Sequence, residues 1–236
     1  MNNTQYNNQS KTLLLNREGK ILIFKVLDLL ETQFHNEEFP PEISHEEPLD
    51  GLVLTILSQN TNDKNRDLAF KNLKENYQDY QSIINSGNEN LEKIIKPAGL
   101  GATKSLRIIN ILKQIRNDFG EYSLKKLSDY SRDEAWNYLI NMQGVGTKTV
   151  ACVLLFDLKM RAFPVDTHVS RITRRLGVVP EKTSADEISL LFENIVPESR
   201  CLGGHVNMIA HGRATCHSRN PDCNNCVLRE FCKYIK

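Results

Sequence analysis

Apolar residues recur at helical spacing along most of this chain, and the expected elements follow from that spacing. Over residues 17–34 the apolar positions fall on one face of an amphipathic helix. Residues 51–58 are apolar on nearly every side, so this helix must lie in a core. Further helical patterns cover 67–77, 80–85, 91–95, 106–115, 131–140, 150–156, 169–176 and 184–195. No segment alternates at the two-residue period of a strand, so the pattern predicts an all-α chain.

Polar and proline-containing segments separate these helices. Residues 1–15 are rich in Asn and Gln and are expected to form a disordered tail without an assignable function. The segment 38–50 contains three prolines and is interpreted as a linker that crosses between domains. Ser131 and Glu134 have the spacing of a capping box and predict a helix start.

Size and charge limit the possible classes of protein. A length of 236 residues fits one large or two small domains with a real core. The formal net charge is only +1, so any nucleic-acid surface must be a local patch. No apolar stretch is long enough for a bilayer, and the first residues lack a signal-peptide pattern. We therefore expect an intracellular protein without a membrane partner, in the cytoplasm or nucleoid, or in the nucleus of a eukaryote. Nothing marks a dimer seam, so we expect a monomer.

The sequence Gly144-Val145-Gly146-Thr147-Lys148 is the main candidate for chemistry. A Gly-x-Gly pair allows a sharp turn and a close backbone approach, and the apolar run 150–156 follows directly. A helix start of this kind suits a phosphate because its amides and dipole favour negative charge. Asp166 comes eighteen residues after Lys148. An amine, a carboxylate and a phosphate-binding turn together indicate chemistry on a nucleic-acid sugar.

Each of these residues also has a simpler interpretation. Lys148 could bind a phosphate without reacting, and Asp166 could cap the helix that follows it, or do both. The cluster 59–63 could hydrogen-bond base edges or cap helices. A second Gly-x-Gly at 99–101 precedes Lys104, which could be mistaken for the catalytic amine. For Lys104 a phosphate contact or a solvated side chain is favoured over catalysis, because no aspartate-bearing motif follows at a comparable distance.

Four cysteines crowd into the C-terminal segment, separated by six, two and five residues: Cys216, Cys223, Cys226 and Cys232. In a reducing compartment such a group favours a metal over disulfides. Four thiolates can converge on one soft metal centre, either zinc or an iron-sulfur cluster. Zinc ribbons normally show two Cys-x-x-Cys pairs, whereas this chain has one. Cys152 and Cys201 are interpreted as packing residues.

Four features in this order carry a resemblance to a known family: the hairpin 144–149, the segment 165–169, His211-Gly212-Arg213-x-x-Cys216, and the cysteine spacing. Together they resemble endonuclease III, the bifunctional DNA glycosylase and abasic-site lyase family of the helix-hairpin-helix-Gly/Pro-Asp superfamily. The likeness covers roughly residues 20–234.

The resemblance implies two helical lobes that bind double-stranded DNA holding a damaged base or an abasic site. One lobe is a six-helix barrel at 46–160, with the helix-hairpin-helix at about 137–158. The other combines 16–45 with 161–236 and carries a [4Fe-4S] cluster on the four cysteines.

The family's functional positions fall on particular residues of this chain. Lys148 and Asp166 take the place of the catalytic pair. Residues that fill the gap left by an extruded base fall on Asn60, Leu100 and His168, with Gln59 as a neighbouring candidate. Further expected DNA contacts are Lys104, Gly144, Val145, Gly146, Thr147 and Arg171. The chain departs from the family pattern in having Gln143 before the hairpin, Thr147 in place of a common arginine, and a less basic loop at 217–222.

The implied reaction requires the damaged nucleotide to be swung out of the stack. A lysine amine attacks only after it loses its proton, and burial and the helix dipole are both expected to favour that state for Lys148. The favoured reading is a glycosylase for oxidised pyrimidines with lyase activity. One alternative is a glycosylase of the same superfamily for mismatched uracil or thymine, or for alkylated bases. Another is a non-catalytic DNA-binding module.

Overall fold

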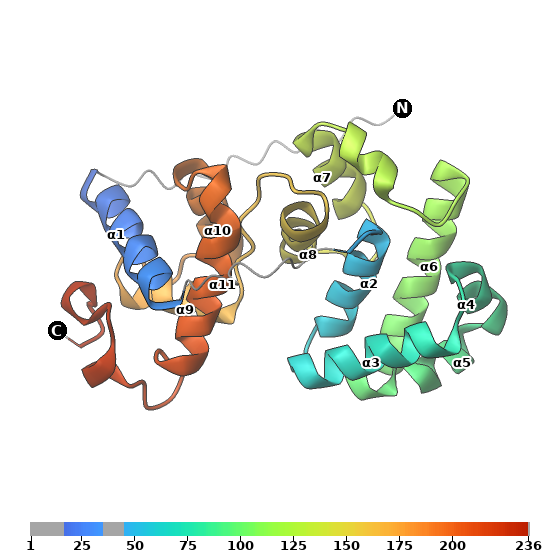
Figure 1. Cartoon of the computed structure of the whole chain (residues 1–236), viewed down its shortest axis with the longest axis horizontal. Helices are drawn as coiled ribbons and strands as arrows, with labels where there is room; N and C mark the ends of the chain where they lie inside the picture. Colours follow the sequence, from blue (N-terminus) through green and yellow to red (C-terminus); the bar gives the residue numbers. More distant parts are fainter. Residues whose placement is uncertain (1–16, 35–44, 236) are drawn as a thin grey trace. The chain divides into compact units, whose positions relative to one another are not determined.

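The computed structural model describes residues 17–34 and 45–235. These residues form helices and connecting turns, with no strand in either range, so the predicted all-α class is confirmed (Figure 1). The predicted tail 1–15 and most of the predicted linker 38–50 lie outside the described residues. Among the helices that are described, none is both long enough and apolar enough to cross a membrane.

The chain forms two compact helical units. The central unit is Glu42–Pro164, and the terminal unit combines Met1–Pro41 with Val165–Lys236. Two lobes were expected, and their boundaries at 45/46 and 160/161 stay a prediction of the sequence. Lys148 belongs to the central unit and Asp166 to the terminal unit.

The central unit packs its helices around the apolar α2 (Pro48–Ser58), which contacts α3, α6 and α8. Ile56 and Leu57 of α2 are fully buried, as its apolar sequence predicts. In Figure 1, α3 runs across the lower end of α2, which it contacts. The helices that follow α2 in this unit are α3 (Asp63–Asn76), α4 (Tyr80–Ser86), α5 (Asn88–Ile94), η1 (Lys96–Ala98), α6 (Gly101–Phe119), η2 (Lys125–Asp129), α7 (Arg132–Ile140), α8 (Thr147–Cys152) and the π-helical η3 (Val153–Asp157).

The start of α2 corrects the predicted linker, which was expected to continue to residue 50. Pro48 occupies the first helical position, where a missing N–H costs nothing. The Glu47 carboxylate caps the helix by accepting from the Leu49 amide at 3.1 Å. It also accepts from the Leu124 amide at 2.8 Å and from the Ser123 hydroxyl at 2.8 Å. Glu47 therefore anchors the beginning of α2 to the chain near residue 124.

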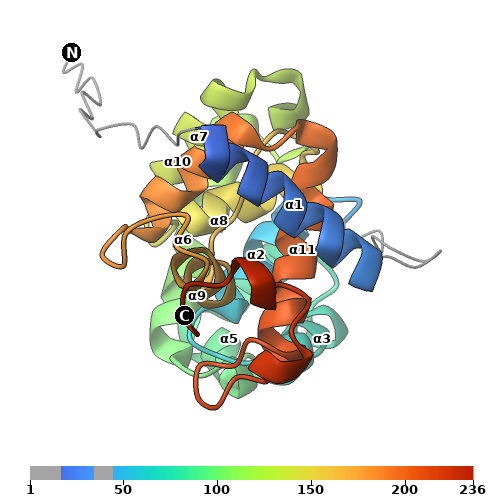
Figure 2. The same cartoon turned by 90° about the vertical axis from the view of Figure 1, so that its left-hand side faces the viewer.

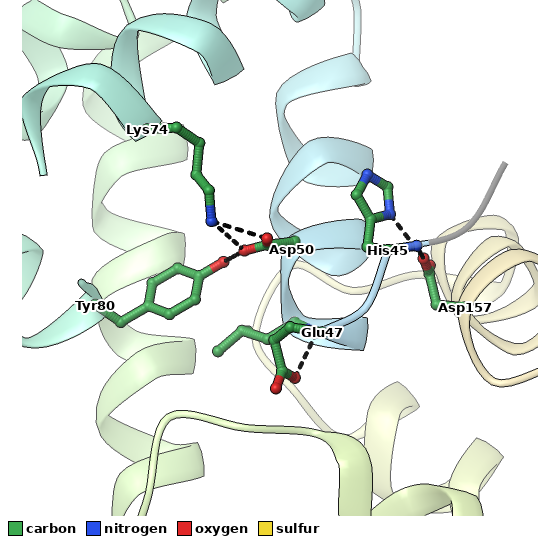
Figure 3. Close-up of polar contacts among 7 residues, drawn as sticks. His45, Glu47, Asp50, Lys74, Tyr80 and Asp157 are labelled. Carbon is green, nitrogen blue, oxygen red and sulfur yellow. Dashed lines mark hydrogen bonds and ion pairs between the residues drawn. The ribbon is translucent and has the colours of Figure 1, made fainter. Parts of the chain in front are cut away.

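A buried carboxylate at the end of η3 binds the segment just before α2 (Figure 3). Asp157 accepts a hydrogen bond from His45 Nδ1 at 2.8 Å, and its side chain is only 3% exposed. A Cβ atom on Gly51 would lie 2.0 Å from Asp157 Oδ2, so only glycine leaves room for this carboxylate. The hydrogen bond to Asp157 raises the pKa of His45. Nearby, Asp50 accepts from Lys74 Nζ at 2.8 Å and from the Tyr80 hydroxyl.

The terminal unit consists of α1 (Arg17–Phe34), α9 (Thr167–Arg175), α10 (Ala185–Ile195), α11 (Glu198–Ala214), η4 (Cys223–Asn225) and η5 (Arg229–Phe231). α11 contacts both α1 and α9, and Figure 2 shows the blue α1 passing over the orange α11. Arg200 links α11 to α1, because its guanidinium donates to Glu31 at 2.8 Å and to Asp28 at 2.7 Å. The sequence pattern predicted α1 with its observed bounds. It did not predict α11, because Gly203 and Gly204 in its middle weaken the helical signal.

Candidate active site

The hairpin between α7 and α8 is built by its two glycines and one buried valine. Gly144 has φ 83°, which favours glycine, and a Cβ there would lie 2.5 Å from the Arg107 side chain. Val145 turns inward and is 6% exposed. Gly146 is the N-cap of α8, and no side chain of the described residues caps this helix start. The turn therefore presents backbone amides and the positive end of a helix, the arrangement expected for binding a phosphate.

Lys148 lies in the first turn of α8 and is exposed. The residues that follow it, Thr149 to Cys152, take the buried face of the helix. The burial that was expected for Lys148 is therefore wrong, because the apolar face of α8 begins one residue later. The amine is accessible to a ligand that approaches the hairpin.

Gln59, at the C-terminus of α2, supports the hairpin from inside the central unit. Its Nε2 lies 3.3 Å from Gly144 O and 3.4 Å from Thr149 Oγ1. Its Oε1 accepts from Arg107 Nη1 at 2.8 Å. The side-chain amide is thus already engaged with protein partners, and a DNA contact by Gln59 stays a prediction. The capping alternative for the cluster 59–63 is confirmed for Asn62, which accepts from the Asn65 amide at 2.9 Å.

Two residues expected to fill a gap in the duplex have left-handed backbone conformations, which asparagine adopts more readily than leucine. Asn60 has φ 53° and Leu100 has φ 50°. Such left-handed conformations cost on the order of 1–3 kcal/mol for most residues and concentrate at functional sites. Leu100 is 57% exposed, a large apolar side chain facing solvent from the turn before α6. Both residues lie on exposed turns of the central unit.

The prediction that Lys104 contacts DNA or solvent is wrong. Its side chain is 1% exposed and is among the largest fully buried side chains of the described residues. Lys104 Nζ donates to Leu57 O and to Ala98 O, each at 2.8 Å. Burial, with a smaller effect from Arg107, lowers its pKa. The second Gly-x-Gly turn therefore leads to a structural lysine.

In the terminal unit, Asp166 caps the helix that begins with Thr167. Its Oδ1 accepts from the amides of His168 and Val169, both at 2.8 Å. This confirms the N-cap interpretation of Asp166, and its catalytic role is a proposal taken up below. The cap fixes the carboxylate at the start of α9 and next to His168.

His168 is held in place by α11 and by Arg171. A Cβ on Gly212 would lie 2.5 Å from His168 Nδ1, so glycine at 212 creates the space for the imidazole. Arg171 Nη2 lies 3.0 Å from His168 Nδ1, and the same guanidinium donates to Gly212 O at 3.1 Å and to Cys216 O at 2.9 Å. Arg171 therefore holds His168 and α11 together within the terminal unit. Its contact with a DNA phosphate stays a prediction.

The four C-terminal cysteines lie close enough for their charges to interact. The pKa of the Cys226 thiol is raised, first by burial and further by Cys216, Cys232 and Cys223. None of the cysteines in the described part of the chain forms a disulfide. Within the same residues no three His, Cys, Asp or Glu side chains are grouped as a ready-made metal site. The donor set of four thiols suits a soft metal centre.

Arg175, the last residue of α9, holds the cysteine segment at several points. Its Nη1 donates to His217 O at 2.7 Å and lies 3.3 Å from Cys216 Sγ. Its guanidinium stacks over the Tyr234 ring at 4.3 Å, and its carbonyl accepts from the Lys233 amide at 2.9 Å. A donor next to a sulfur stabilises the thiolate form that a metal requires.

His211, in the last turn of α11, is a buried side chain next to the cysteine segment. Its Nε2 is 3.6 Å from Cys226 Sγ, and burial lowers its pKa to about 4. The imidazole is therefore neutral at physiological pH. Cys152 and Cys201 are buried in helices, as expected for packing residues.

Sequence reasoning missed three residues that organise these sites: Arg107, Arg175 and Gly212. The sequence does not distinguish the two arginines from solvated helix residues, because these partners are 37 or more positions away. Gly212 belongs to the motif His211-Gly212-Arg213-x-x-Cys216, but the motif alone does not show that this glycine makes space for the His168 side chain.

Comparison with known proteins identifies the family. A family model described as "HhH-GPD superfamily base excision DNA repair protein" matches residues 53–198, more than half of the chain. The chain belongs to this superfamily. An HhH-GPD relative, the endonuclease III of Sulfolobus acidocaldarius, is 36% identical over 188 residues, 78% of this chain and 80% of the relative.

Solved structures agree with the assignment to the HhH-GPD superfamily. The structure of a non-covalent endonuclease III–DNA complex matches with a TM-score of 0.79 at 28% identity, and covers 94% of this chain and 97% of that one. A trapped endonuclease III–DNA covalent intermediate matches with the same TM-score, identity and coverage. The chain is therefore an endonuclease III-like DNA glycosylase of base excision repair.

Proposed function

We propose that this glycosylase removes oxidised pyrimidines from double-stranded DNA and then cuts the strand, with Lys148 as the nucleophile. The observation that carries the proposal is the placement of Lys148: its exposed amine stands in the first turn of α8, directly after a glycine hairpin suited to a phosphate. A similar chain has been trapped as a covalent intermediate with DNA, which supports a covalent mechanism here.

The chemistry assigned to Lys148 proceeds in balanced steps. The neutral amine forms a bond to C1′ of the sugar as the bond from C1′ to the base breaks, and the base leaves with that electron pair and takes up a proton. The bond from C1′ to O4′ then breaks, O4′ takes up a proton released by the amine, and the opened sugar is held as a Schiff base. Loss of a proton from C2′ then expels the 3′ phosphate, which cuts the strand on the 3′ side. Hydrolysis of the imine releases Lys148.

Asp166 is assigned to stabilise positive charge on the sugar and to assist proton transfer. A carboxylate suits both tasks, because the sugar becomes cationic as the base departs. The N-cap hydrogen bonds keep Asp166 at a defined place at the start of α9. A side chain fixed in this way needs little reorganisation during the reaction.

The DNA contacts are assigned to exposed turns. The hairpin residues 144–147 hold a phosphate, and Asn60, Leu100 and His168 fill the gap left by the extruded nucleotide. Extrusion costs a few kcal/mol, and a damaged base lowers that cost. The exposed, left-handed Leu100 and the braced His168 support this assignment.

A [4Fe-4S] cluster is assigned to Cys216, Cys223, Cys226 and Cys232. The four thiolates would hold the cluster, which would supply a structural link within this segment, since neither base removal nor β-elimination is a redox step. The residues of this chain prepare the site through Arg175, which donates next to Cys216 Sγ, and His211, which lies beside Cys226. We expect the protein to act as a monomer.

A panel of duplexes that each hold one lesion tests the substrate class. Oxidised pyrimidines should be released fastest, and strand cuts should accumulate together with free base. Lys148→Gln should abolish the cuts, whereas Lys113→Gln, a change at an exposed lysine of α6, should leave them unchanged. Preferential release of mismatched uracil or thymine, or of alkylated bases, would overturn the assigned substrate. Base release without cuts in the unsubstituted protein would overturn the lyase activity.

A further inference from the structure

One face of α6 holds three polar side chains that together reach the end of α2, the end of η1 and the hairpin before α8. Lys104, Arg107 and Asn110 are spaced three residues apart, which places them on the same side of the helix. Next to them on the helix, Ile108 and Ile111 are buried in the core. The three polar residues therefore stand along the edge of that core.

Lys104 connects two turns that carry left-handed residues. Its ammonium donates to Leu57 O, in the last turn of α2, and to Ala98 O, at the end of η1. Asn60 follows Leu57 by three positions, and Leu100 follows Ala98 by two. A buried amine is costly without hydrogen-bond partners, so these two contacts hold the residues that precede both turns against α6.

Arg107 connects the end of α2 to the catalytic hairpin. Its Nη1 donates to Gln59 Oε1 at 2.8 Å, and Gln59 in turn reaches Gly144 O and Thr149 Oγ1. The Arg107 stem occupies the space in which a Cβ of residue 144 would stand. Gly144 is thus required both for its φ of 83° and for this contact.

Asn110 makes the third connection. Its Nδ2 donates to Gln143 Oε1 at 3.0 Å, directly before the first glycine of the hairpin. A single helix face thereby contacts the end of α2, the carbonyl of Ala98 just before the turn at 99–101, and the start of the hairpin at 143–147. All three belong to the same compact unit.

We propose that Lys104, Arg107 and Asn110 are positioning residues that fix the spacing of the three DNA-facing turns. They set where Asn60 and Leu100 stand relative to the hairpin that precedes Lys148. The DNA role of these turns rests on the proposed function, whereas the spacing itself is a property of the central unit alone. Because a misplacement of about 1 Å can slow a reaction by about 100-fold, loss of one connection affects base extrusion more than overall affinity.

The test uses the full chain with Lys104→Met and Arg107→Met, which keep much of each side chain and remove its donors. Lys113→Met is the control, because Lys113 is an exposed lysine of the same helix, one turn beyond Asn110. Amide hydrogen exchange should speed up by about tenfold or more in the turns that each variant releases, 58–62 and 99–101 for Lys104→Met and 143–147 for Arg107→Met. Exchange in the terminal unit and in the control should match the parent.

A second measurement links the turns to DNA. With 2-aminopurine opposite an abasic-site analogue, the parent should raise the fluorescence on binding, and both variants should lose most of that rise. At saturating protein, the single-turnover rate of base release should fall about tenfold or more, while the dissociation constant for DNA changes less. If Lys104 and Arg107 only stabilised the fold, both variants would have a lower free energy of unfolding, but the rate of base release would not fall more than the affinity for DNA.

The outcomes separate the inference from the proposed function. Parent-like exchange in the released turns of both variants would overturn the inference, even if the parent proves to be an active lyase. Faster exchange in those turns, with a parent that forms no covalent adduct, would support the positioning role and overturn the enzymatic proposal. If Lys104→Met does not fold, Arg107→Met and Asn110→Ala, at half-buried sites, decide the question.

Discussion

At the scale of single residues, two lysines that follow similar Gly-x-Gly turns have opposite environments. Lys148 is exposed at the start of α8, and Lys104 is buried with both of its contacts on backbone carbonyls. The difference arises from position in the helix, since Lys148 is the second residue of α8 and Lys104 is the fourth of α6. Two positions on a helix rotate a side chain by about 200°, enough to exchange solvent for core.

Gly51 is expected to tolerate no side chain. In Gly51→Ala the new Cβ would overlap the buried Asp157 carboxylate, which must then leave His45, and the free energy of unfolding should fall by about 1–3 kcal/mol. Gly203→Ala is the matched control, because nothing lies within 4 Å of its new Cβ in α11. It should be neutral or should stabilise by up to about 1 kcal/mol. Urea denaturation of both variants measures the difference, and equal stabilities would contradict the role given to Gly51.

The His45–Asp157 pair predicts a pH dependence of stability (Figure 3). The pKa of His45 is raised by Asp157 and by the charge of Asp50, against opposing effects of burial and Lys74. The pKa of His45 in the folded protein lies above its ordinary value of about 6.5. The stabilisation that the His45–Asp157 pair contributes is therefore complete below the ordinary pKa and is lost as pH rises through the pKa of the folded protein. The stability gap between the parent and Asp157→Asn should therefore narrow as pH rises. A gap that stays constant or widens would contradict this account.

At the scale of secondary structure, α9 combines two tasks. Its N-terminus carries Asp166 and His168. Its C-terminus carries Arg175, which hydrogen-bonds to the cysteine segment at His217 O. Arg171 lies between them and contacts both His168 and the Cys216 carbonyl. One helix of nine residues thus joins the assigned catalytic carboxylate to the assigned cluster site.

Arg175→Ala should weaken retention of the cluster. The change removes the donor beside Cys216 Sγ, the hydrogen bond to His217 O and the stacking on Tyr234. Iron per chain and visible absorbance, measured over time in the presence of a chelator, should fall several-fold faster than in the parent. Arg219→Ala, at an exposed position of the same segment, should behave like the parent. Equal loss from the two variants would contradict the role of Arg175.

The elements that the sequence predicted well carry strong local signals. The bounds of α1 follow from its amphipathic pattern, and the start of α7 follows from the capping box of Ser131 and Glu134, which the structure confirms. α11 was missed because paired glycines weakened its pattern. α2 begins earlier than the proline-containing sequence predicts, because proline is well suited to the first helical position, which Pro48 occupies.

At the scale of the whole molecule, the family and its candidate residues were predictable, whereas the supporting contacts were not. Motifs 144–149 and 165–169 are local in sequence and therefore readable. The bond from Arg107 to Gln59 spans 48 residues, and the contact of Arg175 with Cys216 spans 41. Such contacts depend on how helices pack, so no local spacing reveals them. For the same reason the burial of Lys104 could not be read from its motif.

The central claim, that Lys148 of this endonuclease III-like glycosylase forms a covalent bond with DNA, is tested most directly by borohydride reduction on a duplex that contains an abasic site. The account predicts a stable protein–DNA adduct whose cross-linked peptide contains Lys148. The adduct should disappear in Lys148→Ala and persist in Lys113→Ala. An adduct that survives Lys148→Ala, or no adduct with the unsubstituted protein, would contradict the mechanism.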